Sequence, residues 1–100
     1  MNYLTNAFSI QMIQRDTCLS FKEISPKEIP EDIISAIGHP DTAAVVGNIL
    51  EREVPCNRIS ISLSRGDALY VAQLTGGRLP EGSTSLPDDF SLKFYEVKEA

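Results

Sequence analysis

The alternation of apolar and polar residues marks several short strands along the chain. It is clearest in Ile59–Ser64, where apolar residues and serines alternate. Because successive side chains of a strand point to opposite faces, this period of two predicts a half-buried strand. The turn Ser64–Asp67 and the apolar segment Leu69–Leu74 then predict a hairpin and its return strand. Three further strands are predicted at Tyr3–Ser9, Thr17–Ile24 and Ser91–Val97.

Proline and glycine delimit the helices that the sequence predicts. Ile10–Arg15 is long enough for one helical turn. A helix is expected to begin at Pro26, to restart at Pro30 and to end at Gly38, because proline suits the first helical position and glycine the end. A second helix is predicted from Pro40 to about Glu53, since its apolar residues recur at helical spacing and form one stripe.

Five strands, with the helices grouped between the second and third, predict an α+β (α/β-like) fold in which helices flank a mixed sheet. One hundred residues provide one hydrophobic core, so we expect a single domain over residues 1–100. Hydrophobic residues make up 42% and charged residues 23%, as in globular chains that fold on their own. Thr75–Asp89 is rich in glycine and proline and lacks apolar periodicity, which indicates a binding or lid loop.

Charge and cysteine content argue against several classes of function. Nine Lys and Arg against fourteen Asp and Glu give a net charge of −5, so we expect no binding of long nucleic acid. One histidine, two cysteines and no CxxC motif offer no zinc site, and we expect neither metal nor cofactor. Cys18 and Cys56 are interpreted as small apolar strand residues. Polar residues interrupt the uncharged opening, Met1–Gln14, which argues against a membrane span or signal peptide and predicts a cytoplasmic protein.

His39, the chain's one histidine, is a candidate for acid–base chemistry. It lies between a helix-ending glycine and a Pro-Asp-Thr helix start, where free backbone N–H groups favour anions. The alternative is that the imidazole caps the helix or faces solvent. Asn6, Ser9 and Gln73 offer hydrogen-bonding groups at predicted strands, although such side chains usually satisfy nearby backbone.

Arginines give one part of the chain a local positive charge. Residues 56–82 contain three arginines against two carboxylates, a net +1 in a chain that is otherwise acidic. Arg58, at the start of a predicted strand, and Arg78, in the glycine-rich loop, are therefore candidates to clamp phosphate groups. Solvated surface arginines remain the alternative interpretation.

Five dispersed motifs together resemble the viral ring nuclease family, the anti-CRISPR enzymes of archaeal viruses, bacteriophages and integrative elements. The motifs are N-A-F-S (Asn6–Ser9), S-A-I-G-H (Ser35–His39), P-x-N-R (Pro55–Arg58), G-D with Gln73 following, and R-L-P-E-G (Arg78–Gly82). They occur in the same order as in that family and cover most of the chain. The glycine pair before Arg78 departs from the family's loop and leaves the reach of Arg78 open.

The resemblance implies a substrate, an assembly and a set of roles. The substrate is cyclic tetra-adenylate, the messenger of type III CRISPR defence, and the protein is a two-fold homodimer that holds the ring at its interface. His39 matches the catalytic histidine. The residues implied to bind substrate are Asn6, Ser9, Arg58, Gln73, Arg78 and Glu81. The loop Gly76–Ser85 is expected to close on the ring.

The implied reaction requires no metal. Each 2′-hydroxyl of the ring can attack its neighbouring phosphorus, and a histidine can protonate the departing 5′-oxygen near neutral pH. The products are linear di-adenylates that end in 2′,3′-cyclic phosphates. Two other classes remain open. One is a non-catalytic dimer that binds a nucleotide or a host protein and leaves its ligand unchanged. The other is a structural dimer with no nucleotide affinity.

Overall fold

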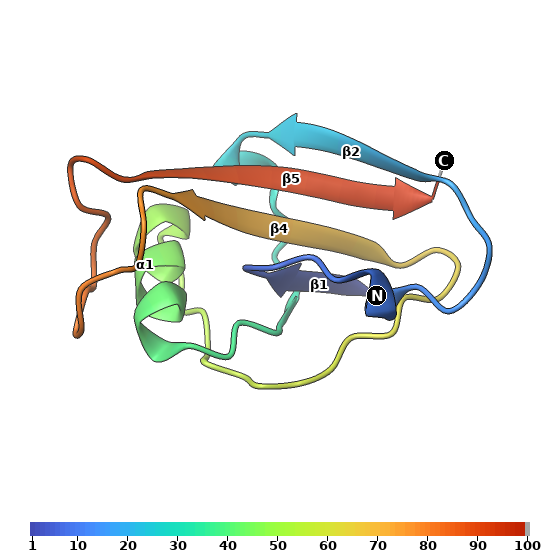
Figure 1. The fold of residues 1–100 in the computed structure, drawn as a ribbon, viewed down its shortest axis with the longest axis horizontal. Coiled ribbons are helices and arrows are strands. Elements are labelled where there is room, and N and C mark those ends of the chain that lie inside the picture. Colours follow the sequence, from blue (N-terminus) through green and yellow to red (C-terminus); the bar gives the residue numbers. More distant parts are fainter. Residues whose placement is uncertain (100) are drawn as a thin grey trace.

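A five-stranded mixed sheet carries one α-helix on one of its faces over residues 1–99, the part of the chain that this computed structural model describes (Figure 1). The strands are β1 (Asn2–Thr5), β2 (Leu19–Ile24), β3 (Ile34–Ser35), β4 (Ala68–Thr75) and β5 (Ser91–Glu99). The helix is α1 (Pro40–Leu50), and two short 3₁₀ turns are η1 (Ile10–Met12) and η2 (Pro26–Glu28). The predicted α+β fold with a mixed five-stranded sheet is therefore confirmed.

Strand β1 lies inside the sheet and is parallel to both of its neighbours. The strand order is β2-β5-β4-β1-β3, in which β5 is antiparallel to both β2 and β4. Tyr3 of β1 is paired with Ile34 of β3 on one side and with Leu69 of β4 on the other. Because parallel strands end at the same edge, the chain leaves β1, β3 and β4 at one edge of the sheet.

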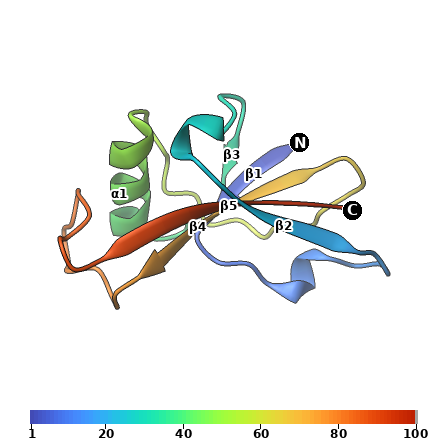
Figure 2. The same cartoon turned by 90° about the horizontal axis from the view of Figure 1, so that it is seen from above.

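Helix α1 connects β3 to β4 and packs on the sheet face that η2 also covers (Figure 2). Ala43 and Val46 of the helix belong to the same buried cluster as Leu4 and Phe94 of the sheet. The predicted helix is confirmed, but it ends at Leu50, before Glu53, because Glu51 adopts a left-handed conformation (φ 56°, ψ 41°) that stops the helical hydrogen bonding.

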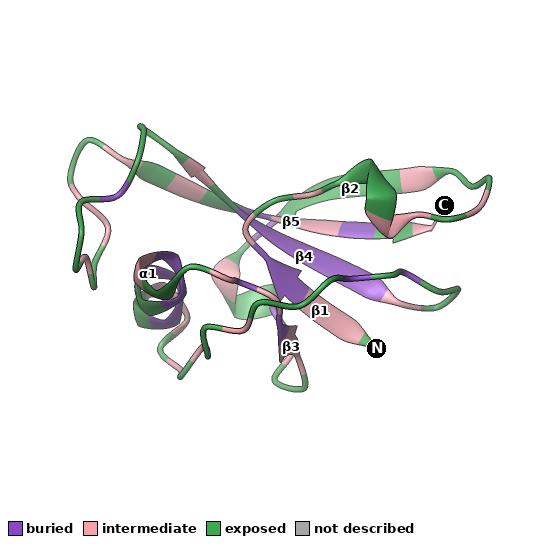
Figure 3. Ribbon diagram, turned by 60° about the horizontal axis from the view of Figure 1, so that its bottom comes forward, coloured by how far each residue is buried: buried purple, intermediate pink, exposed green. Residues whose placement is uncertain are grey.

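Strand β4 supplies core residues to both faces of the sheet and is the most deeply buried strand (Figure 3). Tyr70 and Ala72 belong to the cluster beneath α1, whereas Leu69 and Val71 belong to a second cluster on the opposite face. That opposite face is covered by loops and is incompletely shielded. Phe21 is 59% exposed there, and it stacks edge-to-face on Phe8 with ring centroids 5.6 Å apart.

The prediction of a helix from Pro30 to Gly38 is wrong, because Ile34–Ser35 within this segment form β3. Ser35 pairs with Leu4 in a parallel ladder, and the next residue, Ala36, donates its N–H to the carbonyl of Leu4 at 2.7 Å. β-branched isoleucines suit an extended backbone, and the open edge of β1 provides hydrogen-bonding partners that a short isolated helix lacks.

The strand predicted at Ile59–Ser64 is also wrong, although its alternation is real. Ile61 and Leu63 are buried while the intervening serines are exposed, but among residues 1–99 this segment belongs to no sheet ladder. It runs extended over the face opposite α1, where the N–H of Leu63 donates to the carbonyl of Met12 at 2.8 Å. The turn Ser64–Asp67 therefore leads into β4 without forming a hairpin.

Smaller differences concern the first strand and the cysteines. The predicted strand Tyr3–Ser9 spans Asn2–Thr5, because the chain leaves the sheet at Asn6. The predicted strands at the positions of β2, β4 and β5 are confirmed within one or two residues. Cys18 and Cys56 are free, exposed and outside the strands, so their interpretation as apolar strand residues is wrong.

The turn before β4 gives a test of folding stability. The carboxylate of Asp67 accepts the N–H of Ser64 at 2.9 Å and pairs with the α-amino group of Met1 at 2.9 Å. The Ser64 hydrogen bond first, and then the Met1 ammonium, lower the pKa of Asp67 below its ordinary 3.8. Its stabilisation is therefore complete above this ordinary value and is lost as the pH falls through the lower folded-state pKa.

We expect Asp67→Asn, which keeps an oxygen that can accept the Ser64 N–H but loses the charge paired with the Met1 ammonium, to lower the free energy of unfolding by up to about 1 kcal/mol at pH 7, the usual limit for an exposed ion pair. The difference from the parent protein should shrink in strong acid. Urea unfolding at neutral and acid pH measures both quantities, with Asp88→Asn, an exposed loop carboxylate, as the control. An equal difference at both values of pH would contradict the assignment.

Candidate functional site

His39 lies at the edge of the sheet where β3 ends and α1 begins. It is the N-cap residue of the helix, with an extended backbone (φ −120°, ψ 123°), and its carbonyl accepts the N–H of Ala43 at 3.0 Å. The imidazole is exposed and, within residues 1–99, makes no capping hydrogen bond to the helix. The backbone of His39 thus begins the helix while its side chain is left available for a ligand.

Arg58 is held against the backbone immediately before His39. Its Nε and Nη2 both donate to the carbonyl of Gly38, at 3.3 and 3.1 Å. A Cβ at Gly38 would lie 3.2 Å from Cγ of Arg58, so the glycine makes room for this side chain. The guanidinium is exposed as a whole, and its remaining N–H groups can donate to a ligand beside His39.

The segments that carry His39 and Arg58 are fastened to each other by side chains that the sequence analysis had not assigned. Ser35 donates its hydroxyl to the carbonyl of Pro55 at 2.7 Å. Asn57 donates its side-chain amide to the carbonyl of Ser35 and its backbone N–H to the carbonyl of Ile37, both at 2.8 Å. The S-A-I-G-H and P-x-N-R motifs are therefore hydrogen-bonded to each other, and Ser35 and Asn57 position the segments that carry His39 and Arg58.

The loop between β4 and β5 lies beside α1 (Figures 1 and 2) and carries Arg78 and Glu81, which are both exposed. Leu79, between them, is buried and anchors the loop. One residue after Glu81, the N–H of Gly82 donates to Oδ2 of Asp41 at 3.2 Å, in the first turn of α1. The loop is thereby fixed to the helix two residues from His39.

The backbone at the start of this loop requires the glycine pair. Gly76 and Gly77 have φ angles of +127° and +116°, which residues with side chains rarely adopt. A Cβ at Gly76 would lie 2.9 Å from the Cα of Phe90, so the two ends of the loop are in close contact. The departure from the family motif therefore lies in the turn at the end of β4, before Arg78.

The structure does not gather all the predicted site residues in one place within a single chain. Asn6 directly follows β1 and is half-buried. Ser9 accepts the N–H of Gln11 at 3.3 Å at the start of η1 and lines a hollow with Met12 and Ile61. Gln73 lies on the face opposite α1, where it lines a hollow with Phe8 and Phe21. His39 and Arg58 therefore form one group, with the loop of Arg78 and Glu81 tied close by, while Ser9 and Gln73 border the other face.

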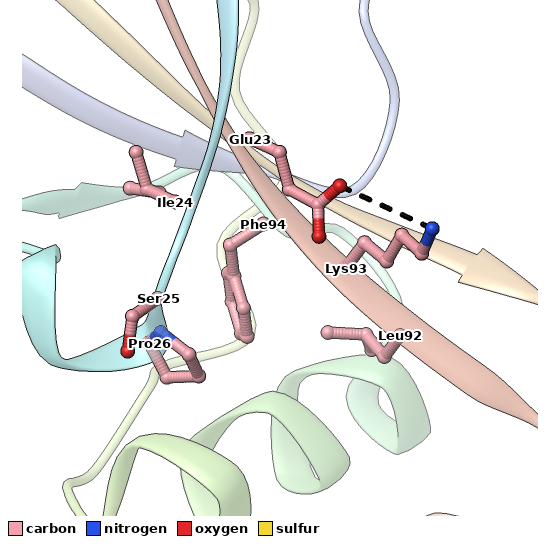
Figure 4. Close-up of a pocket in the computed structure, with 7 residues that line it drawn as sticks. All are labelled: Glu23, Ile24, Ser25, Pro26, Leu92, Lys93 and Phe94. Atoms are coloured by element: carbon pink, nitrogen blue, oxygen red, sulfur yellow. Dashed lines mark ion pairs between the residues drawn. The ribbon is translucent and has the colours of Figure 1, made fainter.

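A further cavity, of about 450 Å³, lies between the end of β2, η2 and the start of β5 (Figure 4). Its lining includes Leu92 and Phe94 and an exposed pair, Glu23 and Lys93, whose charged atoms are 4.0 Å apart. Among the described residues that line it there is neither histidine nor arginine. Its one basic side chain, Lys93, lies opposite the carboxylate of Glu23, so this lining has no net positive charge to favour a phosphate.

Within residues 1–99, no group of three or more histidine, cysteine, aspartate or glutamate side chains could hold a metal ion. In the same residues, no helix is both long enough and apolar enough to cross a membrane.

The known proteins that resemble this chain in sequence come from archaeal viruses. The protein-family model described as STIV B116-like matches residues 2–96. The uncharacterized protein ORF116 of Acidianus filamentous virus 1 is 29% identical over 101 residues, which cover 95% of this chain and 85% of that protein. The uncharacterized protein 26 of Sulfolobus islandicus filamentous virus is 34% identical over 88 residues, or 82% and 74% of the two chains.

A solved structure shares the fold. B116 of Sulfolobus turreted icosahedral virus matches with a TM-score of 0.82 over 97% of each chain, at 24% sequence identity. The sheet with its one helix is therefore common to both proteins. From the family model and these viral relatives, the chain belongs to the STIV B116-like family of archaeal virus proteins.

Proposed function

We propose that this protein is a metal-independent ring nuclease, which cleaves cyclic tetra-adenylate to linear di-adenylates with 2′,3′-cyclic phosphate ends and so suppresses type III CRISPR signalling. The observation that carries the proposal is the exposed side chain of His39 at the start of α1, next in sequence to Gly38, whose carbonyl holds the guanidinium of Arg58. A proton donor next to a fixed cation at a helix N-terminus is suited to a phosphodiester.

The reaction uses a nucleophile that the substrate itself carries. The 2′-oxygen of one ribose attacks the adjacent phosphorus, and the bond from phosphorus to the 5′-oxygen breaks. The 2′-hydroxyl loses a proton to solvent, and His39 in its protonated form gives one to the departing 5′-oxygen. Since the ring supplies the attacking group, the protein has to align ribose and phosphate and to protonate the leaving group.

Charge stabilisation in this scheme comes from side chains and backbone. Arg58 is already oriented by the Gly38 carbonyl, so little side-chain entropy is lost when it binds a phosphate oxygen. Arg78 lies in the loop fixed to the same helix, and the first turn of α1 adds free N–H groups. Two arginines confined to a small site in a chain of net charge −5 favour a compact ligand over long nucleic acid.

The proposal includes a two-fold homodimer formed through the sheet face opposite α1. This face exposes large apolar side chains, with Phe21 at 59% and Ile59 at 42%, and carries a hollow of about 350 Å³. Ser9 and Gln73 border the same face, so a second copy placed on it would bring them to an interface. In such a pair, Ser9 and Gln73 of both copies lie at the interface, while His39 and Arg58 lie at the edge of the sheet where α1 begins.

The first test removes the proposed proton donor. We expect His39→Ala to slow single-turnover cleavage of cyclic tetra-adenylate by about a hundred- to ten-thousandfold, the usual contribution of a general acid. Ring binding and folding should persist, because Pro40 and Asp41 still begin the helix. Chromatography of labelled product and calorimetric titration of the ring measure the two effects.

Two outcomes of that experiment would contradict the proposal. Cleavage by the alanine variant at the parental rate would show that His39 has no catalytic role. A parent protein that binds the ring and leaves it intact would be a sequestering dimer, the non-catalytic alternative. Arg65→Ala, at the exposed turn before β4, serves as the control for general loss of positive charge.

The second test concerns metal. We expect cleavage to continue unchanged in excess EDTA, because the scheme uses a 2′-hydroxyl, a histidine and arginines, with no step that needs a Lewis acid. Cleavage rates measured with and without EDTA test this expectation. Loss of activity in EDTA and its return with magnesium or manganese would point to a different mechanism.

The third test concerns the dimer. Phe21→Asp places a charge on the apolar face and should raise the dimer dissociation constant by about tenfold or more, as for a central apolar contact, and reduce cleavage. Lys22→Asp changes the neighbouring residue of β2, which points to the other face, and is the matched control. Light scattering at micromolar protein concentration measures the oligomeric state. A monomeric parent with full activity would refute the dimer.

A further inference from the structure

The loop between β4 and β5 is fastened to α1 by one side chain that has no role in the chemistry proposed above. Asp41 is half-buried in the first turn of the helix, and its Oδ2 accepts the N–H of Gly82 at 3.2 Å. An acidic residue in a first helical turn usually interacts with the N–H groups of its own helix. Here the carboxylate instead holds a residue 41 positions further along the chain.

Other contacts define what this hydrogen bond controls. Leu79 is 8% exposed, and Thr84 lines a shallow cavity with Ala43 and Gly47 of α1, so the loop is buried before Gly82 and lies against the helix after it. The N–H of Ser83 donates to the carbonyl of Pro80 at 3.1 Å and forms a tight turn. Glu81 lies inside this turn, directly before the anchored glycine.

We propose that Asp41 is a positioning residue, which latches the β4–β5 loop to the start of α1 and thereby holds Arg78 and Glu81 at the side of His39. This inference rests on the proposed function for its effect on cleavage, but the latch itself is a property of the ring-free protein. Release of the Asp41–Gly82 hydrogen bond would free the segment between Leu79 and Ser83 to admit or release a ring.

The negative charge of Asp41 and its hydrogen bond to Gly82 are two separate effects, which different substitutions can distinguish. A negative side chain in the first turn of α1 repels the phosphates of a ring bound beside His39. Asp41→Asn removes the charge and keeps an oxygen that can accept the Gly82 N–H. Asp41→Ala removes both. The two variants lose the same interaction with the helix dipole, so the difference between them isolates the latch.

Hydrogen exchange of the ring-free protein tests the latch without reference to activity. We expect the Gly82 amide to exchange about tenfold faster in Asp41→Ala than in Asp41→Asn, as for loss of one hydrogen bond to a side chain. The amide of Val71 in β4 should be the same in both and reports global stability. Asp88→Ala, an exposed carboxylate of the same loop, should leave the Gly82 amide at its parental rate.

Single-turnover cleavage then tests the positioning role. Asp41→Ala should cleave cyclic tetra-adenylate about tenfold more slowly than Asp41→Asn at saturating protein, because the loop is held for a smaller share of the time. If Asp41→Ala does not fold, Asp41→Ser, which suits a helix start but is too short to reach Gly82, replaces it. Its exchange and cleavage relative to Asp41→Asn carry the same expectations.

The possible failures are distinct. Equal exchange of the Gly82 amide in the alanine (or serine) and asparagine variants would overturn the latch. Faster exchange with equal cleavage would show a latch with no positioning role and would overturn the proposal in that respect. A parent protein that never cleaves the ring would refute the proposed function, and the exchange measurement would still decide whether the latch exists.

Discussion

The parallel pairing of β1 with both β3 and β4 is the constraint on which the rest of the structure depends. It requires the chain to cross the sheet between β3 and β4, and α1 makes that crossing. It also directs the ends of three strands to one edge, where the residues that follow them emerge together. The N-terminus of α1 lies at this edge because only four residues, 36–39, separate the end of β3 from the start of the helix.

Precise placement at that edge comes from backbone carbonyls and small residues. The carbonyl of Gly38 holds Arg58, while Ser35 and Asn57 tie the two segments together. These bonds are made before any ligand arrives, so the cost of ordering the arginine is met in folding. In the proposed function, a site built in this way binds phosphate oxygens with few charged groups, in keeping with a chain whose net charge is negative.

The two faces of the sheet differ in how completely they are covered. The face under α1 is closed by the helix, whereas the opposite face relies on η1 and the extended segment Ile59–Ser64 and leaves Phe21 exposed. An apolar surface of this kind on a small domain is characteristic of an interaction site. The proposed dimer and the proposed site are connected through Ser9 and Gln73, which border this surface.

The sequence by itself determined α1, whose proline start and apolar stripe are local signals, and it located β2, β4 and β5 and singled out His39 with Arg58. Tertiary structure alone decided that Ile34–Ser35 forms a strand, that Ile59–Ser64 does not, and that Asp41 holds Gly82. The physical reason is that side-chain periodicity reports which residues face a core. The partner of a backbone N–H or a carboxylate can lie anywhere in the chain, and only the folded packing selects it.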